Sequence, residues 1–259
     1  MERTTPHTYC RYEPHSNTAE GIYAERRGEG EPLLLLHGLA GSGRWWARNS
    51  AALARHFEVY ALDLPGFGRS CSARPFALAD IAKQLIAWMD HRRIARAHVV
   101  GHSMGGFVAA SLAADAPQRV NRLVLVDAAI AATPQRSSLD MCETLRTLPF
   151  LPGQLLDIFK HELYDGDLRT VLAATRAMFN SDLPTRLARI VAPSLIVWGE
   201  NDPMVPREVG VQLARTLRAR RMALIRHAGH LPMWEQPIAF NRVLLDFLLP
   251  TPQGETQSA

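Results

Sequence analysis

The sequence is poor in cysteine, the residue on which disulfide scaffolds and many zinc sites depend. Its 259 residues include three cysteines, Cys10, Cys71 and Cys142, which lie far apart and form no C-x-x-C pair. An odd number of isolated cysteines predicts neither a disulfide framework nor a zinc site. A hydrophobic core must therefore hold the fold together, and the hydrophobic share of 47% is ordinary for a globular protein with a large core.

Long apolar runs are also missing. The first residues, MERTTPHTYCRYEPH, contain no apolar run of the roughly seven residues that a signal peptide needs. No run elsewhere approaches the roughly 20 residues of a membrane-spanning helix. We therefore expect a cytoplasmic protein without a membrane span. The sequence leaves open whether it is a monomer or a homodimer.

A strong excess of one charge is absent as well. The 29 Lys and Arg residues are nearly balanced by 25 Asp and Glu residues, which leaves a formal net charge of +4. The densest basic cluster is RTLRARR, residues 215–221. A solvated helix end explains this cluster better than a nucleic-acid site does. We expect no nucleic-acid partner.

The sequence does contain a regular alternation of short apolar runs and helical stretches. A short apolar run ended by a turn residue is typical of a strand buried on both faces. Such strands alternating with helices predict an α/β fold, with a mostly parallel sheet flanked by helices. The expected strands are PLLLLHG, FEVYALD, AHVVGHS, RLVLVDA, PSLIVWG and MALIRH, preceded by a hairpin-like pair near residues 9–12 and 22–25.

The alternation stops after Asp127 and resumes at Pro193. The segment between them is too long for one crossover helix, and it contains helical patterns such as LRTVLAATRAMF. We interpret residues 128–192 as a small helical lid inserted between strands 6 and 7. Residues 1–127 and 193–250 then form the core, and residues 251–259 a polar, frayed tail.

One serine stands in a pattern that carries chemistry. GHSMGG follows a predicted strand and opens a predicted helix, which is the context of the nucleophile elbow G-x-S-x-G. The elbow forces Ser103 into a strained backbone conformation, and only residues as small as Gly101 and Gly105 fit two positions away on either side. The turn lifts the Ser103 hydroxyl clear of the sheet and makes it a candidate nucleophile.

A serine nucleophile needs a base, and the base needs an acid that orients it. Both should follow the serine at later strand ends, with the acid before the histidine. Asp202 in WGENDPMVP is the first candidate for the acid. Asp127, which also ends a strand, and Glu200 are its rivals.

The candidate base is His230 in HAGHLP, which follows the strand MALIRH. Its rivals are His227 and His102. His102 lies within the elbow and is expected to point away from Ser103. His227 is expected to be packed or solvated at the end of its strand.

The oxyanion of an acyl-transfer reaction needs two N–H donors. One is expected from Met104, directly after the serine, and the other from Leu39 in the glycine-rich loop after the strand PLLLLHG. That loop, GLAGSG, fits neither nucleotide-binding glycine pattern. Asp63 in ALDLPGFGRS is expected to shape a loop beside the pocket.

Taken together, LHGLAGSG, DLPGFGRS, GHSMGG, WGENDPMVP and HAGHLP resemble the motifs of the α/β-hydrolase superfamily, in its compact, lid-bearing serine esterase group. The resemblance extends from about Gly21 to Leu249, nearly the whole chain. It implies an eight-stranded, mostly parallel sheet. It also implies a serine hydrolase that uses no metal and no organic cofactor.

The serine at the elbow argues against haloalkane dehalogenases and epoxide hydrolases, which carry aspartate there. Hydrolysis of carboxylic esters or thioesters, perhydrolysis, and hydrolysis of carbon–carbon bonds in ring-cleavage products remain. Carbon–carbon hydrolases usually have a polar residue before the serine and Trp after the base, where this chain has His102 and Leu231. We therefore expect a hydrolase of small to medium esters with apolar acyl or alcohol parts. A ligand-binding receptor or scaffold of the same fold is the non-enzymatic alternative.

The apolar side chains of the predicted lid serve mostly to pack its helices onto the sheet, and some of them can line a pocket for the acyl group. The candidates for that pocket are Trp45, Phe150, Phe159, Met178 and Leu231.

Overall fold

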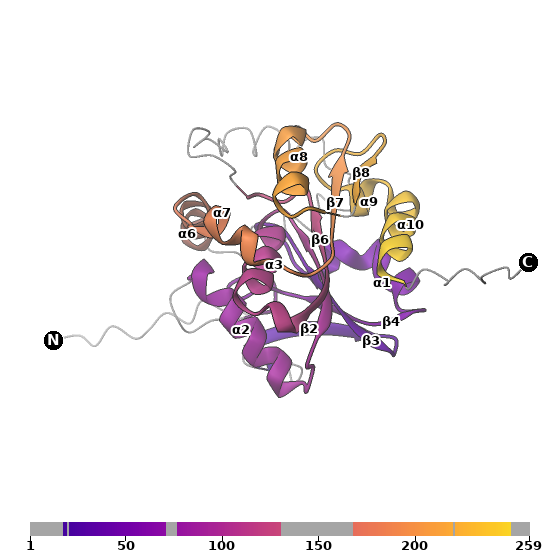
Figure 1. The fold of residues 1–259 in the computed structure, drawn as a ribbon. Helices are drawn as coiled ribbons and strands as arrows, with labels where there is room; N and C mark the ends of the chain where they lie inside the picture. Colours follow the sequence, from indigo (N-terminus) through magenta and orange to yellow (C-terminus); the bar gives the residue numbers. More distant parts are fainter. Residues whose placement is uncertain (1–17, 20, 71–76, 131–167, 220, 250–259) are drawn as a thin grey trace, which may run out of the picture.

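The computed structural model describes residues 18–19, 21–70, 77–130, 168–219 and 221–249. Within these ranges an eight-stranded sheet crosses the molecule in the order β1-β2-β4-β3-β5-β6-β7-β8 (Figure 1). The antiparallel strands are β1 (Thr18–Ala19) and β2 (Ile22–Arg27). The parallel strands are β3 (Glu31–Leu36), β4 (Phe57–Leu62), β5 (Ala97–His102), β6 (Val120–Val126), β7 (Ser194–Gly199) and β8 (Arg221–Ile225). The predicted α/β fold with a mostly parallel eight-stranded sheet is confirmed.

The register of the central strands brings distant parts of the chain to one edge of the sheet. His102 at the end of β5 pairs with Val126 of β6, which pairs with Val197 of β7. The residues that follow these strands therefore emerge side by side. In a parallel sheet this carboxyl edge is where ligands bind.

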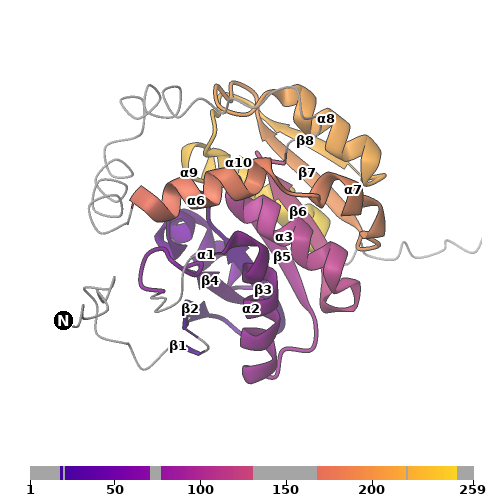
Figure 2. The ribbon, with the colours of Figure 1, turned by 90° about the vertical axis from the view of Figure 1, so that its left-hand side faces the viewer.

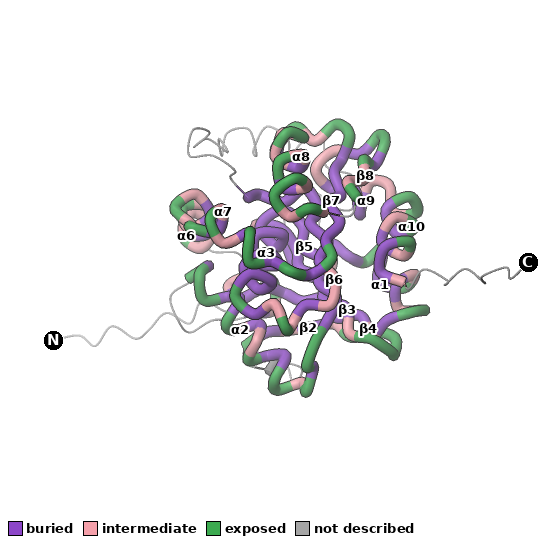
Figure 3. The backbone as a smooth tube through the Cα atoms, viewed as in Figure 1, coloured by how far each residue is buried: buried purple, intermediate pink, exposed green. Residues whose placement is uncertain are grey.

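Helices cover both faces of the sheet (Figures 1 and 2). On one face lie α1 (Ala47–Leu53) and α10 (Pro237–Leu248), and on the other lie α2 (Leu78–His91), α3 (Met104–Asp115) and α8 (Arg207–Thr216). Helix α3 is buried along nearly its whole length, unlike the outer helices (Figure 3). Its many alanine and glycine residues let its backbone lie close to β5 and β6. It is therefore a rigid support for the turn that precedes it.

Two elements of the structure were not predicted from the sequence. The first predicted segment, residues 9–12, lies outside the described residues, and the strand that pairs with β2 is the two-residue β1. A short helix, α9 (Pro232–Glu235), stands between β8 and α10 and was not predicted. Four residues are too few to give a helical period, so only Pro232 at its first position marks it.

The described part of the segment between β6 and β7 is helical. It contains α6 (Leu168–Phe179), α7 (Leu183–Arg186) and a 3-10 turn at Leu187–Arg189. Helix α7 and this turn pack against α3. Residues 131–167 lie outside the described residues, so the lid stays a prediction. No helix within the described ranges is both long and apolar enough to cross a membrane.

Candidate active site

The turn after β5 holds Ser103 in a strained conformation. Its φ is 51° and its ψ is −116°, a combination that costs energy for a residue with a side chain. A Cβ atom on Gly101 would lie 2.2 Å from the Gly105 carbonyl oxygen, and one on Gly105 would lie 2.4 Å from that of Leu36. The glycines are therefore required for the turn to close, as the sequence analysis predicts.

The loop after β8 brings His230 to this serine. His230 Nε2 lies 3.1 Å from Ser103 Oγ, and His230 Nδ1 lies 2.8 Å from Asp202 Oδ2. The carboxylate accepts the Nδ1 proton, so the lone pair of Nε2 faces the hydroxyl. The structure thus brings together the three residues that the sequence analysis selected, from three different strand ends.

Asp202 is held as a carboxylate by the loop that carries it. Its Oδ1 accepts hydrogen bonds from the N–H groups of Met204 at 2.7 Å and Val205 at 3.1 Å. Burial raises the pKa of Asp202, but His230 and these two N–H groups outweigh burial and lower it below the usual value. The carboxylate is therefore ionised at neutral pH beside the imidazole.

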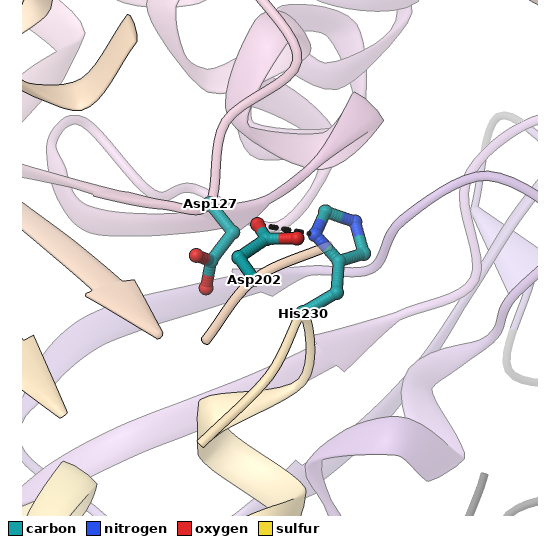
Figure 4. A group of neighbouring side chains, drawn as sticks. All are labelled: Asp127, Asp202 and His230. Carbon is teal, nitrogen blue, oxygen red and sulfur yellow. Dashed lines mark hydrogen bonds and ion pairs between the residues drawn. The ribbon is translucent and has the colours of Figure 1, made fainter. Parts of the chain in front are cut away.

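Asp127 lies beside Asp202 and is fully buried (Figure 4). Its Oδ1 accepts a hydrogen bond from the Gly199 N–H at 2.9 Å, and its Oδ2 has no hydrogen-bond partner among the described residues. Burial, and then the negative charge of Asp202, raise the pKa of Asp127 well above its usual value of 3.8. Its surroundings therefore favour the neutral, protonated form of Asp127.

A metal ion fits this group poorly, although one ligand atom from each of Asp127, Asp202 and His230 lies within 4.8 Å of the others. His230 Nδ1 is already hydrogen-bonded to Asp202, and burial raises the pKa of Asp127, which disfavours its negatively charged form. Hard cations require several charged oxygen ligands. The arrangement instead suits the orientation of an imidazole by a carboxylate.

The burial of Asp127 leads to a prediction about how the stability of the folded protein depends on pH. Between pH 3.8 and the folded-state pKa of Asp127, the native protein holds a proton that the unfolded chain releases, so wild-type stability falls as the pH rises. The loss is up to about 1.4 kcal/mol per pH unit. Asp127→Asn keeps the acceptor for Gly199 and removes this loss. We expect its gain in melting temperature over wild type to be larger at pH 8 than at pH 4.5. An equal gain at both pH values would contradict the neutral acid.

The rival residues lie in places that exclude them from the same chemistry. The N–H of His227 donates to Glu200 at 3.1 Å, and both residues are exposed. His102 Nε2–H donates to the carbonyl oxygen of His230 at 2.7 Å. Burial, and then the charge of His230, lower the pKa of His102 well below its usual value. His102 therefore supports the loop of His230 as a neutral ring and is not the base.

The loop after β3 contacts Ser103 from the other side. A Cβ atom on Gly38 would lie 3.2 Å from Ser103 Cβ, so the loop that also carries Leu39 passes beside Ser103. His37 fixes this loop, because its Nε2 accepts from the Leu64 N–H at 2.8 Å and its Nδ1–H donates to the Gly38 carbonyl at 2.7 Å. Burial lowers the pKa of His37 to about 4, so the ring is neutral.

Asp63 holds the same region together, as expected of a loop-shaping residue. Its carboxylate accepts from the Gly43 N–H at 2.7 Å and pairs with Arg69 at 2.8 Å. Met104, the other expected oxyanion donor, is the first residue of α3, so its N–H has no acceptor within the helix. Both loops that the sequence analysis assigned to the oxyanion thus border Ser103.

The predicted pocket residues are only partly described. Trp45 is buried, and its ring packs against Gly41 and lies 5.8 Å, between ring centroids, from His102. Leu231 follows His230 directly and is buried, and Met178 is buried on α6. Phe150 and Phe159 lie outside the described residues. The pocket as a whole stays a prediction.

The contact between His102 and the His230 backbone was not predicted from the sequence. The contact joins residues that are 128 positions apart, and no local pattern indicates it. The only sequence signal for this contact is the position of His102 directly before Ser103. That position places the His102 ring at the carboxyl end of β5, where it lies beside the ring of His230.

Comparisons with known proteins show which family and which structures the chain is similar to. The model of the Alpha/beta hydrolase family matches residues 33–243. The chain is 31% identical over 286 aligned positions to a 2-hydroxy-6-oxononadienedioate/2-hydroxy-6-oxononatrienedioate hydrolase of Paraburkholderia phymatum, and the match covers 96% of this chain and 99% of the relative. It is 30% identical over 242 positions to "Putative carbamate hydrolase RutD" of Pseudomonas savastanoi pv. phaseolicola, covering 84% of this chain and 93% of that one.

A solved structure of known activity is also similar. A thermophilic esterase from Thermogutta terrifontis, with malate bound, matches with a TM-score of 0.75 at 25% identity. The match covers 88% of this chain and 92% of the esterase chain. The relatives therefore share a fold and are named as hydrolytic enzymes, while the substrate classes in their names differ.

Proposed function

Because this chain belongs to the alpha/beta hydrolase family and is a hydrolase, we propose that it is a serine hydrolase that cleaves uncharged carboxylic esters through an acyl-enzyme on Ser103. One observation carries the proposal: the aligned contacts Ser103 Oγ–His230 Nε2 at 3.1 Å and His230 Nδ1–Asp202 Oδ2 at 2.8 Å. A serine hydroxyl becomes a nucleophile when a base in this position removes its proton.

The acylation step uses these three residues in turn. Ser103 Oγ attacks the carbonyl carbon of the ester while His230 Nε2 takes the hydroxyl proton. Asp202 stabilises the imidazolium that forms. The tetrahedral intermediate collapses when His230 gives this proton to the leaving alcohol, and the acyl group stays on Ser103.

The N–H groups of Met104 and Leu39 are the proposed donors to the oxyanion. They come from the start of α3 and from the loop after β3, two elements that are fixed independently of the substrate. Donors held rigidly in place stabilise the charge that develops in the transition state without reorganising. Water then repeats the sequence on the acyl-enzyme and releases the acid.

The surroundings of the nucleophile support an uncharged substrate. Among the described residues, no hydrogen bond or ion pair of Ser103, His102 or His230 involves Arg or Lys. The side chains beside this group include the buried, apolar Trp45 and Leu231. Such surfaces favour apolar acyl or alcohol groups.

Carbon–carbon bond hydrolysis, the alternative raised by the sequence, is the second candidate, because the Paraburkholderia relative is named as a hydrolase of 2-hydroxy-6-oxononadienedioate and 2-hydroxy-6-oxononatrienedioate and matches almost the entire chain. The substrates in its name are dicarboxylates, which carry two negative charges. The two candidates therefore differ in the charge of the substrate as well as in the bond that is broken.

A substrate panel tests the proposed function. We expect p-nitrophenyl esters with short to medium apolar acyl chains to give kcat/KM values at least about tenfold above those of charged esters, carbamates and ring-cleavage dicarboxylates, because the described part of the site offers apolar contact and pairs neither Ser103 nor His230 with Arg or Lys. Rates measured side by side on one preparation give the comparison. A preference for the dicarboxylates would replace the ester proposal by the second candidate. A protein that hydrolyses nothing and is not labelled by a fluorophosphonate would be a scaffold.

A further inference from the structure

The loop that carries His230 is closed by a carboxylate that the reaction itself does not use. Glu235 Oε2 accepts a hydrogen bond from the N–H of Gly229 at 2.8 Å, and Glu235 Oε1 accepts one from the N–H of Leu231 at 3.1 Å. These two N–H groups belong to the residues on either side of His230. Both oxygens of one side chain thus grip the backbone around the base.

Glu235 is itself fixed at the end of α9. Its own N–H donates to the Leu231 carbonyl at 2.8 Å, so main chain and side chain bond to the same short segment. A Cβ atom on Gly229 would lie 3.3 Å from Glu235 Oε1, and one on Gly199 would lie 1.8 Å from the Gly229 carbonyl oxygen. The backbone at Gly229 is therefore confined between the end of β7 and the Glu235 carboxylate.

We propose that Glu235 is a positioning residue, whose carboxylate clamps the N–H groups on both sides of His230 and so sets the imidazole between Ser103 and Asp202. This inference rests on the proposed function of these three residues. His102 completes the frame, because its Nε2–H binds the carbonyl oxygen of His230. Three consecutive residues, 229–231, thus each have a backbone polar group bound by one of these two side chains.

A carboxylate suits this position for a physical reason. Two parallel N–H donors need two acceptor oxygens, and a charged acceptor makes hydrogen bonds roughly twice as strong as a neutral one. Loop residues lose their geometry more easily than helix or strand residues, and a catalytic group displaced by about 1 Å costs about 100-fold in rate. A clamp on both sides of His230 prevents that displacement.

The test is Glu235→Gln, which preserves size and one acceptor oxygen but turns an NH2 group toward the second N–H. We expect kcat for the best ester of the panel to fall between about tenfold and about 100-fold, with KM changed less than about twofold. The rate at which a fluorophosphonate labels Ser103 should fall by a similar factor, because this probe also needs His230 in place. The melting temperature is measured on the same samples.

Glu200→Gln is the matched control. The Glu200 carboxylate also accepts a hydrogen bond from a backbone N–H of the same loop, that of His227 at 3.1 Å, but this N–H does not flank the base. We expect wild-type kcat and wild-type labelling for this variant. If Glu200→Gln loses as much kcat as Glu235→Gln, loop stability alone explains the effect and the clamp is overturned.

The two levels of inference fail in different ways. Wild-type protein that neither hydrolyses the panel nor reacts with the fluorophosphonate refutes the proposed function. Wild-type protein that does both, while Glu235→Gln matches it in kcat and labelling, refutes the clamp alone. If Glu235→Gln does not fold, Glu235→Asp, which keeps both oxygens on a shorter stem, replaces it. Wild-type kcat in that variant would equally refute the clamp.

Discussion

Replacement of Ser103 by alanine is expected to lower kcat for ester hydrolysis by about 10⁴-fold or more and to leave the fold intact. The Ser103 hydroxyl faces His230 Nε2 at 3.1 Å, and no other hydroxyl of the described residues bonds to that ring. Alanine retains the Cβ atom, so the strain at a φ of 51° is the same in both proteins. The activity that remains in Ser103→Ala comes from the oxyanion donors and from substrate binding alone. Saturation kinetics with one ester, together with thermal unfolding of both proteins, measure the effect.

Ser111→Ala provides the control for this substitution. Ser111 lies on α3, the helix that follows the nucleophile, and is as buried as Ser103, at 8% exposure each. Ser111 makes no contact with His230, so the kcat of Ser111→Ala is expected to stay near that of wild type. Ester turnover by Ser103→Ala within about tenfold of wild type would show that no acyl-enzyme forms on this residue.

The fold was predictable where local pattern and tertiary structure require the same residues. The run from Leu33 to Leu36 is wholly buried in β3, and a strand covered on both faces leaves no position for a polar side chain. The roles of Gly101 and Gly105 were predictable for a similar reason, since backbone atoms occupy the space that a Cβ atom would need at these positions. Such positions accept few residue types, and the sequence therefore records them.

The supports of the proposed base were not predictable in the same way. His102 and Glu235 act through hydrogen bonds to backbone groups. Because nearly every residue type has the same backbone groups, no sequence pattern marks these partners. The neutral state of Asp127 depends on its burial and on its distance from Asp202, both of which appear only when β6 and β7 are paired. Motif spacing indicates which residues react. Tertiary pairing decides what holds them in place.

The second large effect on kcat is expected from replacing Asp202, the proposed acid that orients His230. Asp202→Asn is expected to lower kcat by about 10⁴-fold, because an amide that turns its NH2 group toward His230 stabilises the wrong tautomer of the ring. The amide oxygen can still accept from the N–H groups of Met204 and Val205, so the loop itself should keep its conformation. The loss then reflects the orientation and charge of the proposed base. Saturation kinetics and thermal unfolding separate this effect from a loss of folded protein.

Asp127→Asn is the matched comparison, because it makes the same chemical change in the neighbouring carboxyl group. The raised pKa of Asp127 favours its neutral form, and asparagine keeps the acceptor for the Gly199 N–H, so kcat should stay within about threefold of wild type. The two variants therefore separate a carboxylate that must carry a charge from one that must not. If Asp127→Asn abolished turnover and Asp202→Asn spared it, the acid that orients His230 would be Asp127. The 2.8 Å contact between His230 and Asp202 would then be a structural ion pair only.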